Sequence, residues 1–177
     1  MFGDSLSAGY GLTTGQDWPS LLDKRLAKAK LGYRVVNASI SGETTAGGRA
    51  RLPAALRRLK PSVVILALGA NDGLRGLSLT QMRNNLTAMI DAAKAHRARV
   101  LLIGMKLPPN YGPDYDRRFE EGFRRVAKRE KVALLPFLLA PIATDLNAFQ
   151  ADGLHPTAAA QAAVLDHVWP ALRPLLK

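Results

Sequence analysis

The chain of 177 residues contains no cysteine and only three histidines. Without cysteine, a disulfide, a thiolate metal site and a cysteine nucleophile are all excluded. The histidines, His96, His155 and His167, provide few ligands for a zinc site. No apolar run approaches the roughly 18 residues that a membrane-spanning helix needs. No signal peptide is visible either, but such segments are removed from mature proteins, so the compartment stays undetermined.

The composition is that of a folded domain. Hydrophobic residues make up 47% of the chain, and this length is enough for one domain to bury a core. Such a composition argues against disorder. No linker, repeat or low-complexity tract divides the sequence, and we therefore predict a single domain over residues 1–177.

The net charge of the chain is +11, which favours anionic partners through long-range attraction. Nucleic-acid binding is one interpretation of this charge. The basic residues are scattered, however, and fall mostly on the polar faces of predicted helices. We therefore favour solvated helix faces, with attraction to anionic lipid or acyl-phosphate substrates as the alternative.

Short apolar runs alternate with amphipathic stretches along the chain. The predicted strands are residues 33–37, 62–68, 100–105 and 131–135. The predicted helices are residues 18–31, 46–59, 79–96 and 114–131, followed by one that begins near Pro156 and ends or kinks at Pro170. This alternation predicts an α/β fold with a parallel sheet covered on both sides. Ligands bind such sheets at the carboxyl ends of the strands.

A serine near one end of the chain has a suitable histidine and aspartate near the other. Ser5 lies in a Gly-Asp-Ser-Leu run, and Asp152 precedes His155 by three residues. A serine hydroxyl needs a base within hydrogen-bond reach, and the base needs an orienting group. The alternative interpretations are a polar turn at Ser5, and a turn-capping aspartate beside a surface histidine.

Two further positions could hold a developing oxyanion. Gly42 could donate its backbone N–H, and Asn71 could donate its side-chain amide. Either residue could also serve only in a turn. His96 and His167 lie in predicted helices, and we interpret both as structural. One feature is incomplete, because Ser5 should follow a strand of about five residues and only four residues precede it.

Together these motifs resemble the SGNH (GDSL-type) serine hydrolase superfamily. The resemblance is carried by residues 3–6, Gly42, residues 69–72 and residues 152–156. Longer runs, at residues 36–42, 51–54, 71–76 and 107–112, look like the bacterial thioesterase I, lysophospholipase and arylesterase group. The resemblance spans essentially the whole chain. It implies a flavodoxin-like three-layer α/β/α sandwich whose mostly parallel sheet has the strand order 2-1-3-4-5, with the first strand truncated.

The resemblance also implies roles for single residues. Ser5 would be the nucleophile, His155 the base and Asp152 its orienting group. The Ser5 N–H, the Gly42 N–H and the Asn71 side chain would form the oxyanion hole. The acyl chain would lie between two loops, with Gly73, Leu74 and Arg75 on one side and Leu107, Asn110 and Tyr111 on the other. Neither a metal nor an organic cofactor is implied.

The expected activity is hydrolysis of short- to medium-chain acyl or aryl esters, and also of thioesters and lysophospholipids. An acyl-CoA thioesterase or a carbohydrate acetylesterase of the same fold is the nearest alternative. A nucleic-acid-binding module and an inactive scaffold are the others. The unpaired edge left by the short first strand could pair with a second chain in a dimer. Relatives of this group are often exported to the periplasm.

Overall fold

The computed structural model describes residues 1–176, and within them four parallel strands form one sheet in the order β1-β2-β3-β4. The strands are β1 (Phe2–Gly3), β2 (Val63–Ala67), β3 (Arg99–Ile103) and β4 (Ala133–Leu135). Three of the four predicted strands are therefore confirmed, each at slightly shorter bounds. The fourth prediction is wrong, because residues 33–37 do not form a strand of the sheet.

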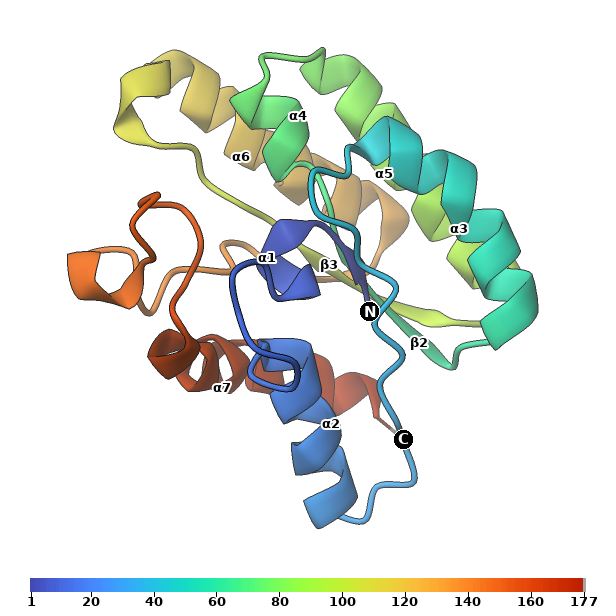
Figure 1. Ribbon diagram of the computed structural model, residues 1–177. Coiled ribbons are helices and arrows are strands. Elements are labelled where there is room, and N and C mark those ends of the chain that lie inside the picture. Colours follow the sequence, from blue (N-terminus) through green and yellow to red (C-terminus); the bar gives the residue numbers. More distant parts are fainter. Residues whose placement is uncertain (177) are drawn as a thin grey trace.

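Helices cover both faces of this sheet (Figure 1). The α-helices are α1 (Ser5–Ala8), α2 (Trp18–Lys28), α3 (Thr45–Leu59), α4 (Ala70–Leu74), α5 (Leu79–Ala95), α6 (Pro113–Glu130) and α7 (Gln161–Leu172). Short 3-10 turns are η1 (Pro109–Tyr111), η2 (Leu146–Ala148), η3 (Ala158–Ala160) and η4 (Arg173–Leu175). Figure 1 shows α3, α5 and α6 on one face, and α2 and α7 on the other. The three-layer α/β/α prediction is confirmed.

Alternating side chains of β2 supply the two halves of the core. Val64 and Leu66 pack in the cluster that includes residues of α3, α5 and α6. Ile65 and Ala67 pack in the cluster that includes residues of α2 and α7. Because successive strand side chains point to opposite faces, a strand covered on both sides has to be apolar throughout. Across residues 1–176, no helix is long and apolar enough to cross a membrane.

Side-chain caps fix where the longer helices begin. Asp17, Thr44 and Ser78 each accept a hydrogen bond from a backbone N–H in the first turn of α2, α3 and α5. These bonds satisfy donors that have no partner inside the helix. The last helix differs from its prediction, because Pro156 lies in a β-bridge with Phe149 and the α-helix begins only at Gln161. Pro170 lies inside that helix, which continues to Leu172.

The first strand is short, and it is held from both sides. On one side, Phe2 and Gly3 are in register with Leu66 and Ala67 of β2. On the other side lies the extended segment 33–40. The Met1 ammonium donates to the Val36 carbonyl at 2.8 Å. The N–H groups of Ala38 and Ile40 donate to the carbonyls of Met1 and Gly3, at 2.9 and 3.0 Å. Segment 33–40 therefore takes the place of the expected second strand, but its partner is too short for a regular ladder.

Candidate active site

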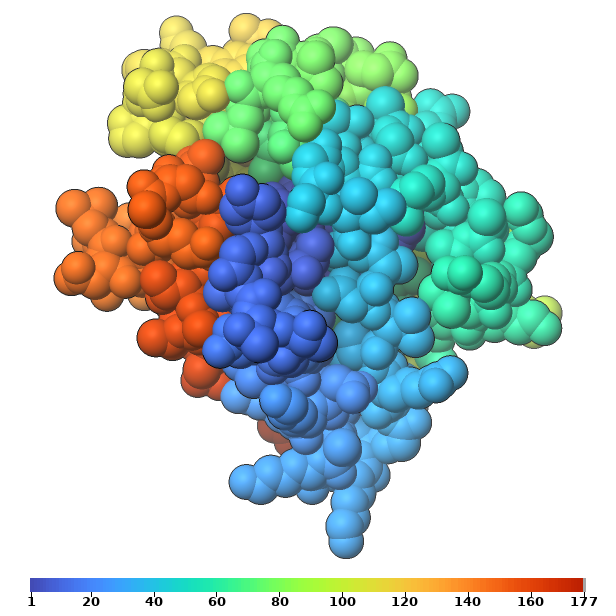
Figure 2. Space-filling model, viewed as in Figure 1, coloured from blue at the N-terminus to red at the C-terminus, as the bar shows by residue number. Residues whose placement is uncertain are grey.

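Four segments that are far apart in the sequence meet beyond the carboxyl ends of the strands. In Figure 2 the dark-blue N-terminal residues form a strip between the cyan segment before α3 and the orange segment before α7. The green residues around α4 lie above this strip. Sequence analysis predicted that the functional residues lie at this edge of the sheet.

Ser5 is held at the point where β1 turns into α1. Asp4 is the N-cap of that helix, and its Oδ1 accepts a hydrogen bond from the Leu6 N–H at 3.0 Å. The Asn37 side chain donates to the Ser7 carbonyl at 2.7 Å and ties the first turn to segment 33–40. The Ser5 hydroxyl oxygen lies 2.8 Å from Nε2 of His155. The serine and histidine, 150 residues apart in the sequence, are therefore in direct contact.

Asp152 both closes a turn and contacts the imidazole. Its Oδ1 accepts hydrogen bonds from the N–H groups of Leu154 and His155, at 2.9 and 3.0 Å. Its Oδ2 lies 2.6 Å from Nδ1 of His155. The backbone bond from His155, reinforced by the bond from Leu154, lowers the pKa of Asp152 to about 2. One carboxylate therefore both caps this turn and contacts the imidazole.

Two residues that sequence analysis missed support this loop. Tyr10 packs its ring against the His155 imidazole, with ring centroids 4.4 Å apart. Gln150 donates from Nε2 to the carbonyls of Tyr10 and Pro156, at 2.9 and 3.1 Å, and its N–H donates to the His155 carbonyl at 2.8 Å. Tyr10 lies about 140 residues from both His155 and Gln150, so no local motif marks their contacts.

Gly42 and Asn71 lie on the opposite side of the site. Gly42 has a φ of +78°, which a residue with a Cβ rarely adopts. The Asn71 amide donates to the Glu43 carbonyl at 3.0 Å, and the Arg75 guanidinium donates to the Gly42 carbonyl at 3.0 Å. Among the described residues, neither the Ser5 N–H nor the Gly42 N–H has an acceptor. Three potential hydrogen-bond donors, the Ser5 N–H, the Gly42 N–H and the Asn71 amide, thus come from adjoining segments.

A buried polar cluster joins these segments. The Asp72 carboxylate, 3% exposed, accepts hydrogen bonds from the Thr45 N–H at 2.8 Å and from the Thr45 hydroxyl at 2.5 Å. Asn85 of α5 donates to the same hydroxyl at 3.1 Å. In the sequence, Asp72 was noted only as a member of the motif of residues 69–72, and Thr45 was overlooked. A buried carboxylate needs hydrogen-bond donors, and here both come from the residue that begins α3.

The two predicted walls of the substrate groove contact each other. The Tyr111 hydroxyl donates to the Leu74 carbonyl at 2.8 Å. Arg75 and Asn110 are exposed, whereas Leu107 is buried. One correction concerns Gly73 and Leu74, which belong to α4 rather than to a loop.

Gly73 lies in the core rather than on the groove surface. A Cβ there would come within 2.7 Å of Phe119 and 2.8 Å of Leu107. The glycine therefore permits close packing beneath the site. Because it is buried, the structure gives no support for direct contact between its α-carbon and an acyl chain.

The other two histidines each contact a backbone carbonyl. Nδ1 of His96 lies 2.9 Å from the Ala92 carbonyl, and Nε2 of His167 lies 3.0 Å from the Phe137 carbonyl. Within residues 1–176, no group of three or more histidine, aspartate or glutamate residues could hold a metal ion.

The three-layer fold brings a hydroxyl, an imidazole and a carboxylate into contact at one edge of its sheet, an arrangement that recurs among hydrolases. Residues 1–163 match the model of the GDSL-like Lipase/Acylhydrolase family. The chain belongs to this family, within the SGNH hydrolase superfamily.

Named relatives cover nearly the whole chain. Esterase TesA of Pseudomonas aeruginosa is 53% identical over 174 residues, which are 98% of this chain and 87% of the relative. Thioesterase 1/protease 1/lysophospholipase L1 of Escherichia coli K12 is 41% identical over 177 residues, covering 99% and 83%. The solved esterase EstA of Pseudoalteromonas, inhibited by monoethylphosphonate, is 37% identical with a TM-score of 0.94, covering 99% and 96%.

Proposed function

We propose that this ester hydrolase uses Ser5 as its nucleophile, His155 as its general base and Asp152 as the group that orients the base. The observation that carries this proposal is one continuous series of contacts. Asp152 Oδ2 lies 2.6 Å from His155 Nδ1, and His155 Nε2 lies 2.8 Å from Ser5 Oγ. A carboxylate at Nδ1 favours the tautomer whose Nε2 accepts the serine proton.

The reaction begins when Ser5 Oγ attacks the acyl carbonyl and its proton passes to His155 Nε2. The Ser5 N–H, the Gly42 N–H and the Asn71 amide stabilise the negative oxygen that forms. The carbon–oxygen or carbon–sulfur bond to the leaving group then breaks, and His155 returns the proton to that group. Water attacks the resulting acyl-enzyme, with His155 again acting as base, and releases the acid and free Ser5.

The substrates that we propose are small acyl or aryl esters of short to medium chain length, with thioesters and lysophospholipids as further candidates. The names of the two relatives support esters, thioesters and lysophospholipids as substrate classes. The hydrogen bond from Tyr111 to Leu74 supports a groove bounded by the end of α4 and by the turn η1. We further propose that residues 1–177 act as one domain, and that its partners are small molecules rather than nucleic acid.

The decisive experiment compares the initial rates of p-nitrophenyl butyrate hydrolysis by the wild type and Ser5→Ala, purified side by side. We expect activity in the first and a near-background rate in the second, at equal melting temperatures. Equal rates would assign the reaction to another residue. A fluorophosphonate probe provides an independent measurement, because it should label the wild type and leave Ser5→Ala unlabelled. Butyryl-CoA hydrolysis by the same pair then separates thioesterase from esterase activity.

A further inference from the structure

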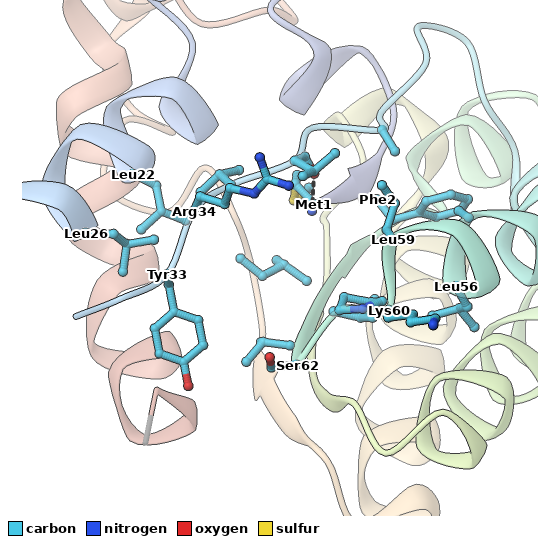
Figure 3. Close-up of a pocket in the computed structure, with 18 of the residues that line it drawn as sticks. Met1, Phe2, Leu22, Leu26, Tyr33, Arg34, Leu56, Leu59, Lys60 and Ser62 are labelled. Carbon is cyan, nitrogen blue, oxygen red and sulfur yellow. Dashed lines mark hydrogen bonds between the residues drawn. The ribbon is translucent and has the colours of Figure 1, made fainter. Parts of the chain in front are cut away.

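A polar cavity of about 410 Å³ lies between the start of α5 and one face of α6. It differs from the pocket in Figure 3, most of whose lining residues are apolar. We call the polar cavity the arginine pocket. Its walls include Ser78, Thr80, Arg83, Tyr115, Arg118 and Arg125.

The three arginines of this pocket come from two neighbouring helices. Arg83 belongs to α5, whereas Arg118 and Arg125 belong to α6, and the two helices run side by side (Figure 1). A Cβ added at Gly122 of α6 would lie 3.6 Å from Cγ of Arg83. The stem of Arg83 therefore lies against α6 at Gly122. Arg118 and Arg125 stand about one turn before and one turn after that point, on the same face of the helix.

Most of the positive charge in the arginine pocket has no anionic partner. Arg125 forms an ion pair with Glu121 at 2.7 Å. Arg83 donates to the neutral hydroxyl of Thr80 at 2.9 Å. Arg118 makes neither a hydrogen bond nor an ion pair within residues 1–176. Glu121 is the single acidic side chain among the described lining residues, so three cations and one anion leave a net charge of two.

Two hydroxyl groups add neutral donors beside these cations. Ser78 Oγ accepts from the Gln81 N–H at 3.3 Å, and Thr80 Oγ1 accepts from Arg83 at 2.9 Å. Accepting a hydrogen bond occupies a lone pair of a hydroxyl and leaves its proton free. The protons of Ser78 and Thr80 are therefore available to an anion in the pocket.

The combination of guanidinium and hydroxyl groups is suited to phosphate. A guanidinium is a planar fork of donors that can bind two phosphate oxygens at once. A phosphate monoester carries a charge of about −1.5 to −2 at pH 7, which matches the uncompensated charge of the pocket. The cavity volume lies within the range of small-molecule sites, so there is room for more than a bare phosphate ion.

The arginine pocket adjoins the proposed acyl groove but not the catalytic residues. Tyr115 lines it, and the hydroxyl of this residue donates to the Gly73 carbonyl at 3.3 Å. The Tyr115 ring stacks on Tyr111 of the groove wall, with centroids 6.5 Å apart. Neither the proposed nucleophile nor the proposed base lines the pocket.

We propose that the arginine pocket binds the phosphate group of a small anionic molecule or of a lipid headgroup. Arg83 and Arg118 hold the phosphate oxygens, and the hydroxyls of Ser78 and Thr80 donate to it. Arg125 contributes charge while it remains paired with Glu121. This site is independent of the proposed ester hydrolysis.

The test has two arms, because the same phosphate chemistry occurs in soluble molecules and in lipids. In the first arm, calorimetry measures binding of glycerol 3-phosphate, and we expect saturable one-to-one binding with a melting temperature that rises with ligand concentration. In the second arm, the protein is sedimented with phosphatidylglycerol vesicles. Binding in the first arm identifies a soluble phosphate ester as the ligand, and binding only in the second identifies a lipid headgroup.

Matched variants separate the pocket from the general positive charge of the chain. Arg83→Gln and Arg118→Gln should each weaken binding roughly tenfold, the scale of one lost hydrogen bond to a charged group. Arg124→Gln removes the same charge from an exposed position of α6 outside the pocket and should leave binding nearly unchanged. Because the Arg118 guanidinium makes no bond within residues 1–176, its replacement should not alter the melting temperature.

Three outcomes would overturn the proposal. The first is the absence of saturable binding in both arms. The second is an Arg124→Gln variant weakened as much as Arg118→Gln, which would assign binding to the diffuse charge of α6. The third is malonate bound as tightly as glycerol 3-phosphate, which would show selection for charge rather than for phosphate. Ser5→Ala should bind the phosphate ligand like the wild type, so failure here leaves the proposed hydrolysis standing.

Discussion

The Asp72 carboxylate binds the N–H and the hydroxyl of Thr45, at 2.8 and 2.5 Å, and so joins the start of α3 to α4. The loop before Thr45 carries Gly42, and α4 carries Asn71. Two proposed oxyanion donors, 29 positions apart in the sequence, are thereby held in one geometry. The bonds from Asn71 to Glu43 and from Arg75 to Gly42 join the same segments at the surface of the site. We infer that Asp72, which joins them from below, is a positioning residue.

Replacing Asp72 with asparagine should therefore impair turnover more than substrate binding. An amide offers only one oxygen, so one of the two Thr45 donors loses its acceptor, at a cost of about 1–3 kcal/mol in the free energy of unfolding. We expect kcat for p-nitrophenyl butyrate to fall while KM changes little. Thr45→Ser keeps both donors and serves as the control. A Thr45→Ser variant as impaired as Asp72→Asn would contradict this role.

Asn71→Ala tests the oxyanion hole directly. Removing one such donor costs about 10²–10³ in kcat, because the negative oxygen exists only in the transition state and the intermediate. We expect a loss of this size, measured with p-nitrophenyl butyrate, together with a nearly unchanged melting temperature. A normal turnover number in the folded variant would remove Asn71 from the mechanism.

Asp4 should make stability depend on pH. Burial raises the pKa of its carboxyl from 3.8 to about 6. The folded state therefore holds this proton more tightly than the unfolded state. The resulting stabilisation is fully present below about pH 4 and is lost as the pH rises through about 6.

Asp4→Asn should abolish that pH dependence, because an amide does not titrate. The amide oxygen can still accept the hydrogen bond from the Leu6 N–H. Relative to the wild type, the free energy of unfolding of the variant should rise by about 3 kcal/mol between pH 4 and pH 8. Urea unfolding across this range measures the difference. A constant difference between the two proteins would show that Asp4 has the same pKa in both states.

Tyr10 should affect catalysis through its ring rather than its hydroxyl. The ring packs against the imidazole of His155 at 4.4 Å, and such contacts contribute about 0.5–1.5 kcal/mol. Tyr10→Phe should therefore retain kcat for p-nitrophenyl butyrate, whereas Tyr10→Leu should lower it severalfold. Equal kcat values for Tyr10→Phe and Tyr10→Leu would contradict this expectation.

Tyr111 should influence the choice of acyl chain. Its hydroxyl donates to the Leu74 carbonyl and holds together the two walls proposed for the groove. We expect Tyr111→Ala to shift the profile of kcat/KM across p-nitrophenyl acetate, butyrate and octanoate. Asn110→Ala, an exposed neighbour in the same turn, is the matched control. An unchanged profile in Tyr111→Ala would remove this loop from the groove.

Most of the fold could be predicted because its signals are local. Apolar runs marked β2, β3 and β4, and helical periodicity marked α2, α3, α5 and α6 within about three residues of their observed bounds. Residues 33–37 were misassigned for a physical reason. Their apolar content is typical of a strand, but strand status requires a partner, and β1 is only two residues long.

The site could be predicted only where a motif marked it. Ser5, Asp152 and His155 stand in short recognisable runs, and their side chains are found in contact. Tyr10 and Gln150 were missed because the contacts of Tyr10 with His155 and with Gln150 span about 140 residues of sequence. Gly73 was placed on the groove surface because the family resemblance puts the acyl chain near the residues after Asn71, and only the packing of Phe119 reveals its burial.

The pairing of Met1–Gly3 with residues 36–40 has a consequence for how this enzyme loses activity. Three terminal hydrogen bonds hold the backbone that precedes the nucleophile, and their other partners lead directly into the loop of Gly42. This short pairing is a unit that can open by itself, well before the sheet melts. Thermal inactivation should therefore precede global unfolding, and hydrogen exchange at Ala38 and Ile40 should report the lifetime of the competent site.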